Sequence, residues 1–166
     1  NWYTTFYQRF GSPTTADYDC SLSPCTISQP ASRSTPYYVV GNMTTQGNWN
    51  VGAGETLIFI VNGNLTLNGN VNLTGKGFVS FIVNGNITVS SSVGSNANNS
   101  TNPDIEGIYV TSPTGTFSTG ASTVPGKARL VLKGTFVAAS FLLQRDLDQA
   151  GGDNTTTSSE LFIYNR

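Results

Sequence analysis

The stretch IFIVNGNLTL at residues 58–67 recurs almost unchanged 22 positions later, as SFIVNGNITV at residues 80–89. A weaker third copy, YYVVGNMT at residues 37–44, stands in the same register one period earlier. All three copies place a glycine at the same point of the period. A fixed short period indicates one structural unit that stacks on copies of itself, so this repeat decides the fold.

Each copy has the pattern of short β-strands. A run of β-branched and aromatic residues, too short for a helix, leads to a turn at glycine and then to alternating polar and apolar residues. Equivalent apolar positions such as Met43, Leu65 and Ile87 lie 22 residues apart, which predicts that they point inward and stack. We therefore predict an all-β, single-domain β-solenoid (a parallel β-helix) of about five coils of 22 residues.

The alternative fold is an antiparallel β-sandwich, because Asn-Gly pairs also fit two-residue hairpins. Hairpins do not require equal spacing between successive units, whereas stacked coils do, and this favours the solenoid. Outward asparagines would then form amide ladders between coils, with Asn62 on Asn84, and Asn64 on Asn86. By the same register Trp49 should be an inward core residue.

The period is interrupted after residue 93 and then resumes. Residues 108–110 and 130–132 again lie 22 apart, and a last strand is expected at residues 161–164. The solenoid domain is predicted to span residues 37–166, with inserted loops at 94–104, 111–125 and 146–159.

Residues 1–36 are predicted to form an N-terminal cap or docking arm, because the open ends of a solenoid need covering. Aromatic residues spaced for one face of a short amphipathic helix begin this segment: Trp2, Phe6 and Phe10, with Tyr3 and Tyr7 beside them. The helix either covers the first coil of its own chain or docks on a neighbouring subunit.

Cys20 and Cys25 are the two cysteines of the chain, and there is no histidine. A metal site would require further soft ligands, so we expect no metal and no cofactor. The short spacing favours a disulfide loop formed in an oxidising compartment over two free thiols.

The composition excludes several classes of function. Charged residues make up 10% of the chain, against about 25% in typical globular proteins. The net charge is −1 and basic residues form no run, so no nucleic acid partner is expected. The longest apolar run, residues 57–61, is far too short for a membrane span.

Two pairs of carboxylates are the best candidates for polysaccharide chemistry, Asp104 with Glu106 and Asp146 with Asp148. We interpret both pairs as ordinary solvated or turn-forming acids, since outward coil positions carry Asn, Thr and Ser instead of acids. Asp153 extends the second pair toward a calcium site, but the spacing does not match a calcium-binding loop. A structural contact of Arg145 with Asp146 or Glu160 is the preferred interpretation.

Seven Asn-x-Ser/Thr triplets are candidate N-glycosylation sites: Asn42, Asn64, Asn72, Asn86, Asn98, Asn99 and Asn154. Outward alternation of Asn and Thr along strands would create such triplets without any glycosylation.

The coils resemble a short β-solenoid of the bactofilin-like or pectate-lyase-like kind, on coil period and strand pattern alone. The segments 61–66, 145–147 and 160–164 are similar to uncharacterised secreted surface proteins of environmental bacteria. This resemblance implies an exported protein and no established activity. Bactofilin-like solenoids polymerise end to end in the cytoplasm, whereas the cysteine pair and hydroxyl-rich surface here favour an extracellular or cell-surface location.

The leading hypothesis is a non-enzymatic structural protein that assembles with itself into a filament or surface layer. Apolar and aromatic residues near the two termini would form the subunit contacts: Trp2, Tyr3, Phe6, Tyr7, Phe10, Phe162 and Tyr164. The alternative is a carbohydrate-binding or adhesive module that binds glycans on Tyr37, Trp49 or Tyr109. A polysaccharide-active enzyme using Asp146 and Asp148 is a third hypothesis.

Overall fold

The computed structural model describes residues 2–121, 129–148 and 153–164. One helix, α1 (Trp2–Arg9), precedes the strands. The strands are β1 (Tyr18–Ser28), β2 (Tyr37–Gln46), β3 (Trp49–Val51), β4 (Thr56–Asn62), β5 (Leu65–Leu67), β6 (Val71–Leu73), β7 (Phe78–Val83), β8 (Ile87–Val89), β9 (Ile105–Val110), β10 (Thr116–Ser118), β11 (Leu130–Val137), β12 (Ser140–Leu142) and β13 (Glu160–Ile163). The all-β class predicted from the sequence is therefore confirmed.

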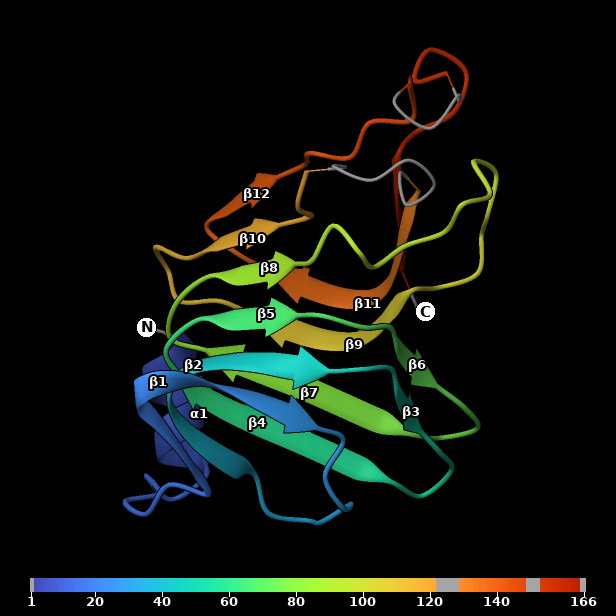
Figure 1. The fold of residues 1–166 in the computed structure, drawn as a ribbon. Coiled ribbons are helices and arrows are strands. Elements are labelled where there is room, and N and C mark those ends of the chain that lie inside the picture. Colours follow the sequence, from blue (N-terminus) through green and yellow to red (C-terminus); the bar gives the residue numbers. More distant parts are fainter. Residues whose placement is uncertain (1, 122–128, 149–152, 165–166) are drawn as a thin grey trace.

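These strands form one large sheet, whose main path has the order β12-β10-β8-β5-β2-β4-β7-β9-β11-β13. Off this path, β1 pairs with β2, and β6 pairs with β3 and β9. β2 belongs to both halves, since Tyr37–Val40 pair with β4 and Met43 and Thr44 pair with β5. The sheet therefore turns back on itself at β2, and its halves lie on opposite sides of the molecule (Figure 1). All pairings between the described strands are parallel, which does not fit the antiparallel alternative.

The 22-residue register is present in the middle of the chain and lengthens afterwards. Phe59 pairs with Phe81, and Leu65 with Ile87, at the predicted offset. The predicted alignment of 108–110 with 130–132 is wrong, because Tyr109 pairs with Phe136 across 27 residues. Here Gly134 lies on Gly107, and this backbone contact sets the register instead of the equal spacing.

The core lies between the two halves of the sheet. Met43, Leu65 and Ile87 are buried one above the other, as predicted. The sequence did not reveal an aromatic column beside them, in which adjacent ring centres lie 5.0–5.5 Å apart. Its members are Tyr37, Phe59, Phe81, Tyr109 and Phe136. Stacked aromatic pairs stabilise a core by more than the burial of their surface area alone. The column therefore stabilises the packing of each repeat on the next.

The corner that follows β4 and β7 carries the predicted asparagine ladder. Asn84 Nδ2 donates to Asn62 Oδ1, and Asn64 Nδ2 donates to Asn42 Oδ1, each over 3.0 Å. Gly63 is required at this corner, because a Cβ atom there would collide with the backbone oxygen of Gly41. The asparagine side chains and the glycines therefore determine how each repeat stacks on the preceding one.

Three loops were predicted, and the structure changes one of them. Residues 94–104 form no named strand, and the described residues of 146–159 form none either. The loop at 111–125 contains β10, which pairs with β8 and β12 and extends the sheet. Residues 122–125 of this predicted loop lie outside the described residues. The last strand begins at Glu160, one residue before its predicted start.

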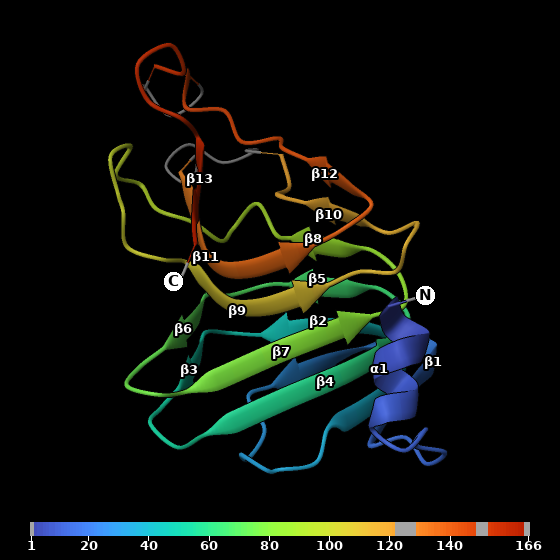
Figure 2. The same cartoon turned by 180° about the vertical axis from the view of Figure 1, so that it is seen from behind.

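The predicted N-terminal helix is present and packs on its own chain, where Tyr7 meets Tyr38 of β2 in the first repeat. α1 lies against the outer face of β4, β7 and β9 (Figure 2). Tyr3 is buried there in a cluster with Tyr38, Ile60, Ile82 and Val110. The outer face of these strands is apolar, and the helix shields part of it from water.

Candidate functional site

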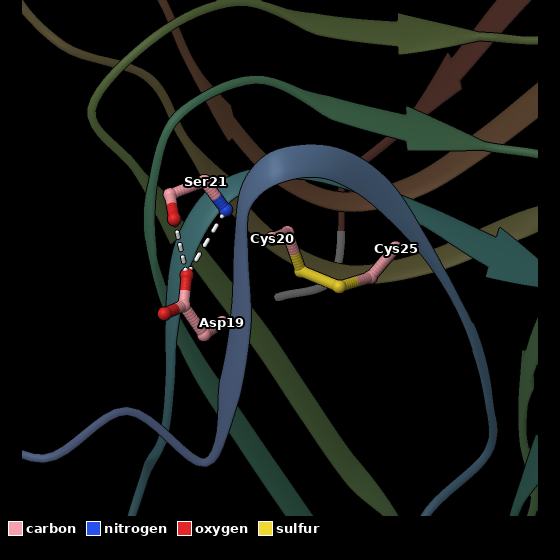
Figure 3. Close-up of a disulfide and its surroundings, with 4 residues drawn as sticks. All are labelled: Asp19, Cys20, Ser21 and Cys25. Carbon is pink, nitrogen blue, oxygen red and sulfur yellow. Dashed lines mark hydrogen bonds between the residues drawn. A yellow bond between two sulfur atoms is a disulfide. The ribbon is translucent and has the colours of Figure 1, made fainter.

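The two ends of the sheet differ in chemistry, and β1 forms the first of them. Cys20 and Cys25 form the predicted disulfide (Figure 3). In β1 the register shifts between these cysteines, so that four residues of β1 lie opposite Asn42 alone. Asp19 accepts hydrogen bonds from the backbone and the hydroxyl of Ser21 within this bulge. Such a bulge at an edge strand interrupts the row of groups to which another strand would pair.

A salt bridge closes the same end of the molecule, which we call the N-terminal end (residues 17–36). The Arg33 guanidinium donates to both carboxylate oxygens of Asp17, over 2.8 and 2.6 Å. Its central carbon lies 3.5 Å from the centre of the Tyr37 ring, the first ring of the aromatic column. These hydrogen bonds lower the pKa of Asp17. The column therefore ends here with Tyr37 covered by a paired cation, and the half-buried Tyr18 ring lies beside it at 6.1 Å.

The opposite end of the column is apolar and exposed, and we call it the C-terminal end. Phe136 meets Phe162 edge-on, with ring centres 5.8 Å apart, and Phe162 in turn meets Phe141 at 6.0 Å. Phe141 is 44% exposed and Phe162 is 41% exposed. Leu142, Leu143 and Tyr164 beside them are more exposed still.

A groove of about 260 Å³ opens at this end. It is lined by Gly134, Thr135, Phe136, Phe141, Phe162, Ile163 and Tyr164. Large apolar side chains that gather on one surface mark contacts with other molecules more often than single exposed ones do. The C-terminal end is therefore the first candidate surface.

The one charged residue of β12 and β13, Glu160, is half-buried, and its carboxylate is hydrogen-bonded within the chain. Glu160 Oε1 accepts hydrogen bonds from the Arg145 backbone and the Thr119 hydroxyl. The Arg145 guanidinium is itself buried and donates to the carbonyl oxygens of Thr119, Ser90 and Ser91. Burial lowers the pKa of Arg145 to about 10. The predicted contact of Arg145 with Glu160 is thus present, and the one carboxylate of β12 and β13 is engaged by hydrogen bonds within its own chain.

A second apolar surface flanks α1, and we call it the helix face (Trp2, Phe6, Phe10, Phe78 and Val137). One groove runs between Phe6 and Phe10 on the helix and Phe78 on β7, and another between Trp2 and Val137 on β11. Trp2 is 57% exposed, and Phe10, Phe78 and Val137 are partly exposed. The helix therefore leaves apolar sheet uncovered on both of its sides.

The residues predicted to dock a neighbouring subunit fall on different surfaces. Tyr3 and Tyr7 stack on each other, and Tyr7 contacts Tyr38; Tyr3 is buried and Tyr7 is half-buried. Trp2, Phe6 and Phe10 lie at the helix face, and Phe162 and Tyr164 at the C-terminal end. In this structure α1 packs on its own chain.

Sequence reasoning missed the contribution of β12. Ser140–Leu142 were assigned to no repeat, although the run SFLL at 140–143 is apolar and directly follows a predicted strand. Such a run is expected to be buried. Only its place at the edge of the sheet leaves Phe141, Leu142 and Leu143 exposed.

The three aromatic residues proposed as glycan platforms are all buried. Trp49 and Tyr109 are 0% exposed, and Tyr37 is covered by Arg33. The core position predicted for Trp49 is confirmed. Sugar rings stack on accessible aromatic faces, so these side chains are not available for that role.

The carboxylates of Asp104 and Glu106 hold neighbouring strands together, so the interpretation of this pair as solvated acids is wrong. Both are buried. Asp104 Oδ2 accepts from the backbone of Val131, and Glu106 Oε2 from the backbone of Leu73. Glu106 Oε1 also lies 2.9 Å from Lys133 Nζ. Their carboxylates accept hydrogen bonds from backbone N–H groups next to the insertion at 94–104, where the stacking of repeats is interrupted.

The second acid pair closes a turn. Asp146 Oδ1 accepts from the Asp148 backbone and from Asn154 Nδ2, and Asp153 binds Thr155. The described part of the chain contains no group of three or more His, Cys, Asp or Glu side chains that could hold a metal ion.

The glycosylation candidates differ in how their amides are engaged. Asn64, Asn72 and Asn154 donate their amide nitrogens to other side chains. The side-chain amide nitrogens of Asn42, Asn86 and Asn99 donate no hydrogen bond to another described residue, and the Asn86 side-chain oxygen accepts from the Thr116 backbone. Asn98 Oδ1 is buried without a partner in the described structure. Attachment of a glycan at Asn64 would therefore break the ladder, whereas attachment at Asn99 would break no such bond.

Among the residues described, none of the helical structure is long and apolar enough to cross a membrane. We found no family model, curated protein or solved structure that matches this chain.

Proposed function

We propose that this protein is a non-enzymatic extracellular structural protein, a subunit that associates with copies of itself in a cell-surface filament or layer. The observation that carries this proposal is the exposed C-terminal end, where Phe141 and Phe162 extend the aromatic column to the surface. Phe141 also contacts Phe117 of the core, so these rings are held in place before any partner arrives.

Covering the apolar side chains of this end would contribute favourable free energy to association. Burial of apolar surface contributes about 25 cal/mol per Å², and partly exposed aromatic rings are frequent centres of protein interfaces. β12 and β13 are the outermost strands of the sheet order, so their outer backbone groups also lack a strand partner among the described residues. An apolar surface beside an open strand edge favours a protein partner.

A filament or layer requires more than one contact surface per subunit, because a single self-complementary contact stops at a dimer. The helix face supplies the second. Its apolar side chains differ from those of the C-terminal end, although Thr135 on β11 lines a groove at each surface. The helix itself lies on the outer face of β4, β7 and β9 (Figure 2). Its apolar residues, above all Trp2 and Phe78, would pack against the same face of another copy.

The fold that we propose for this subunit is a short β-solenoid. The parallel pairing of equivalent residues 22 positions apart supports it. Repeats of this kind bury their apolar faces against neighbouring repeats, and β12 and β13 have a strand partner on one side only among the described residues. These open strand edges lie at the C-terminal end.

The proposed location rests on the disulfide and the low charge. Disulfides persist in oxidising compartments outside the cytosol, and the Cys20–Cys25 pair is formed here. The proposal of a structural role fits the use of the buried acids, since Asp104 and Glu106 are engaged by backbone amides and Lys133.

Sedimentation and negative-stain electron microscopy of the purified chain test this function. We expect the average mass to rise with protein concentration and regular assemblies to appear at high concentration. The variant Phe141→Ser/Phe162→Ser should weaken association at least tenfold, as loss of interface anchors does. Circular dichroism must first show that this variant keeps its β-rich spectrum.

A chain that stays monomeric at high concentration would contradict the proposal. Unchanged assembly in the double variant would also contradict it, because the C-terminal end would then not be the contact surface. Ser92→Ala serves as the matched control, since this hydroxyl lies away from both apolar surfaces and bonds to Asn68.

A further inference from the structure

We propose that the partner of the C-terminal end is the C-terminal end of a second copy, related to the first by a two-fold axis. This inference rests on the proposed function and names the partner surface for it. The competing arrangement is head to tail, in which the C-terminal end of one copy meets the N-terminal end of the next.

The N-terminal end is poorly suited to cover an aromatic surface. Its first aromatic ring, Tyr37, is already occupied by the Arg33 guanidinium. Removal of that guanidinium from water against a neighbour would cost free energy, because its charge is matched only by Asp17 at the surface. The bulge between Cys20 and Cys25 also interrupts the strand to which an incoming edge would pair.

The C-terminal end can face itself without electrostatic cost. Two-fold symmetry brings each side chain near its own copy, so like charges there would repel. β12 carries no charged residue, and the only one on β13 is Glu160, whose carboxylate is engaged by Thr119, Ser159 and the Arg145 backbone. Lys133 on the adjacent β11 is paired with Glu106. Among the described residues of β11, β12 and β13, each charged side chain is therefore already engaged within its own subunit.

The shape of this end is also self-complementary. A groove of about 260 Å³ lies between β11, β12 and β13. Leu142 and Leu143 stand beside it and are about half exposed. In a two-fold contact, the protruding aliphatic side chains of each copy can enter the groove of the other copy. Such self-complementarity is what an isologous contact requires. Tyr164, which is 74% exposed, stands at the rim of the groove.

Leu22 is the one feature of the opposite end that favours head-to-tail contact. It lies in the disulfide bulge and is completely exposed. Its immediate neighbours, Ser21 and Ser23, are exposed and polar, so it offers one isolated apolar side chain. A single leucine cannot cover Phe141, Phe162 and the two leucines together, so the observations favour the two-fold arrangement.

Cysteine cross-linking distinguishes the two arrangements. Ser140→Cys places a thiol at the start of β12, and Ser28→Cys places one at the end of β1, where both serines are exposed. Each variant of the full chain is treated with a short bismaleimide, alone and in an equimolar mixture, with the Cys20–Cys25 disulfide left oxidised. We expect Ser140→Cys alone to give a covalent dimer, and the mixture to give no 28–140 product.

Mass spectrometry of the cross-linked peptides identifies the product. A 28–140 cross-link in the mixture without the 140–140 product would overturn the inference and establish head-to-tail contact. Association in sedimentation without either product would also overturn it and leave the helix face as the contact of the proposed function. A chain that does not associate at all contradicts the proposed function itself, so the two failures are distinguishable.

Two substitutions complete the test. Leu142→Ser should weaken the dimer at least tenfold in sedimentation, whereas Leu22→Ser, which removes a more exposed leucine from the other end, should leave it unchanged. The opposite result would show that Leu22 fills the groove. Because both leucines are on the surface, neither change is expected to prevent folding.

Discussion

The guanidinium carbon of Arg33 lies 3.5 Å from the centre of the Tyr37 ring. This contact ends the aromatic column at one side of the molecule, while Phe136 and Phe162 continue it to the surface at the other. A paired cation can remain in contact with water. Burial of exposed aromatic rings against a partner is favourable, because it removes apolar surface from water. The two ends of one continuous core are therefore chemically unequal, and this inequality directs the proposed assembly.

Arg33→Lys should destabilise the chain by about 1–2 kcal/mol, the combined size of an exposed cation–π contact and a surface salt bridge. Lysine keeps the charge, but it loses the planar fork that binds both oxygens of Asp17. Urea unfolding followed by circular dichroism measures the change. Arg9→Lys on the exposed side of α1 is the control and should be neutral; equal losses in both variants would refute this role of Arg33.

Protonation of Asp17 should lower the free energy of unfolding at acid pH. Its pKa is lowered mainly by the hydrogen bonds from Arg33, so the carboxylate is stabilised in the folded state. This contribution is present above the ordinary value of 3.8 and is lost as pH falls through the lower folded value. The pair is about one-third exposed, so we expect only about 0.5–1 kcal/mol. Asp17→Asn should flatten this part of the stability–pH curve; an unchanged curve would exclude Asp17 as its origin.

Loss of the disulfide should cost about 2 kcal/mol, the loop-closure value for a ring of this length. The variant Cys20→Ala/Cys25→Ala should therefore melt several degrees lower and keep its β-rich spectrum, because β1 still pairs with β2 on both sides of the bulge. Reduction of the unmodified chain is the matched comparison and should give a similar shift. A reduced chain that unfolds completely would mean that the disulfide is required for folding.

Gly63→Ala should destabilise the chain by about 2–3 kcal/mol, because the new methyl group would overlap the backbone oxygen of Gly41. Gly52→Ala is the control. Its nearest neighbour would be the flexible carboxylate of Glu55 at 3.3 Å, which can move aside. Thermal unfolding of the two variants gives the comparison, and a tolerated Gly63→Ala would show that the corner is looser than the structure indicates.

Tyr3→Ala should loosen α1 from the sheet. Tyr3 is buried against Tyr38 and stacks on Tyr7, so its truncation should cost about 2 kcal/mol, less than in a central core. The apolar strands beneath would then bind a hydrophobic dye such as ANS more strongly. Trp2→Ala removes a larger but more exposed ring and should change stability by less than about 0.5 kcal/mol. Equal effects of the two changes would mean that α1 packs through its other face.

The sequence was sufficient to predict the middle of the molecule. Phe59 and Phe81 follow the period because identical turns and strand lengths separate them, so local pattern and stacking agree. Beyond residue 93 the insertions change the offset, and contacts between distant backbones, such as Gly107 with Gly134, determine the pairing. No periodicity encodes such a contact.

The candidate surface was predictable only in part for a related reason. Phe162 was expected at a subunit contact from its place near the end of the chain. Phe141 and Leu142 resemble core residues in the sequence and are exposed only because β12 has no further strand beside it. The number of repeats before the stack ends is a property of the whole chain, so a local pattern cannot reveal it.

The constant offset between β4 and β7, and between β5 and β8, makes residues 56–77 an interchangeable module. Each strand added to a sheet advances it by about 4.8 Å, so duplication of this segment would lengthen the molecule by a fixed step without altering either end. In natural or designed variants with more repeats, the length of the subunit would then be set by the whole number of repeats in its sequence.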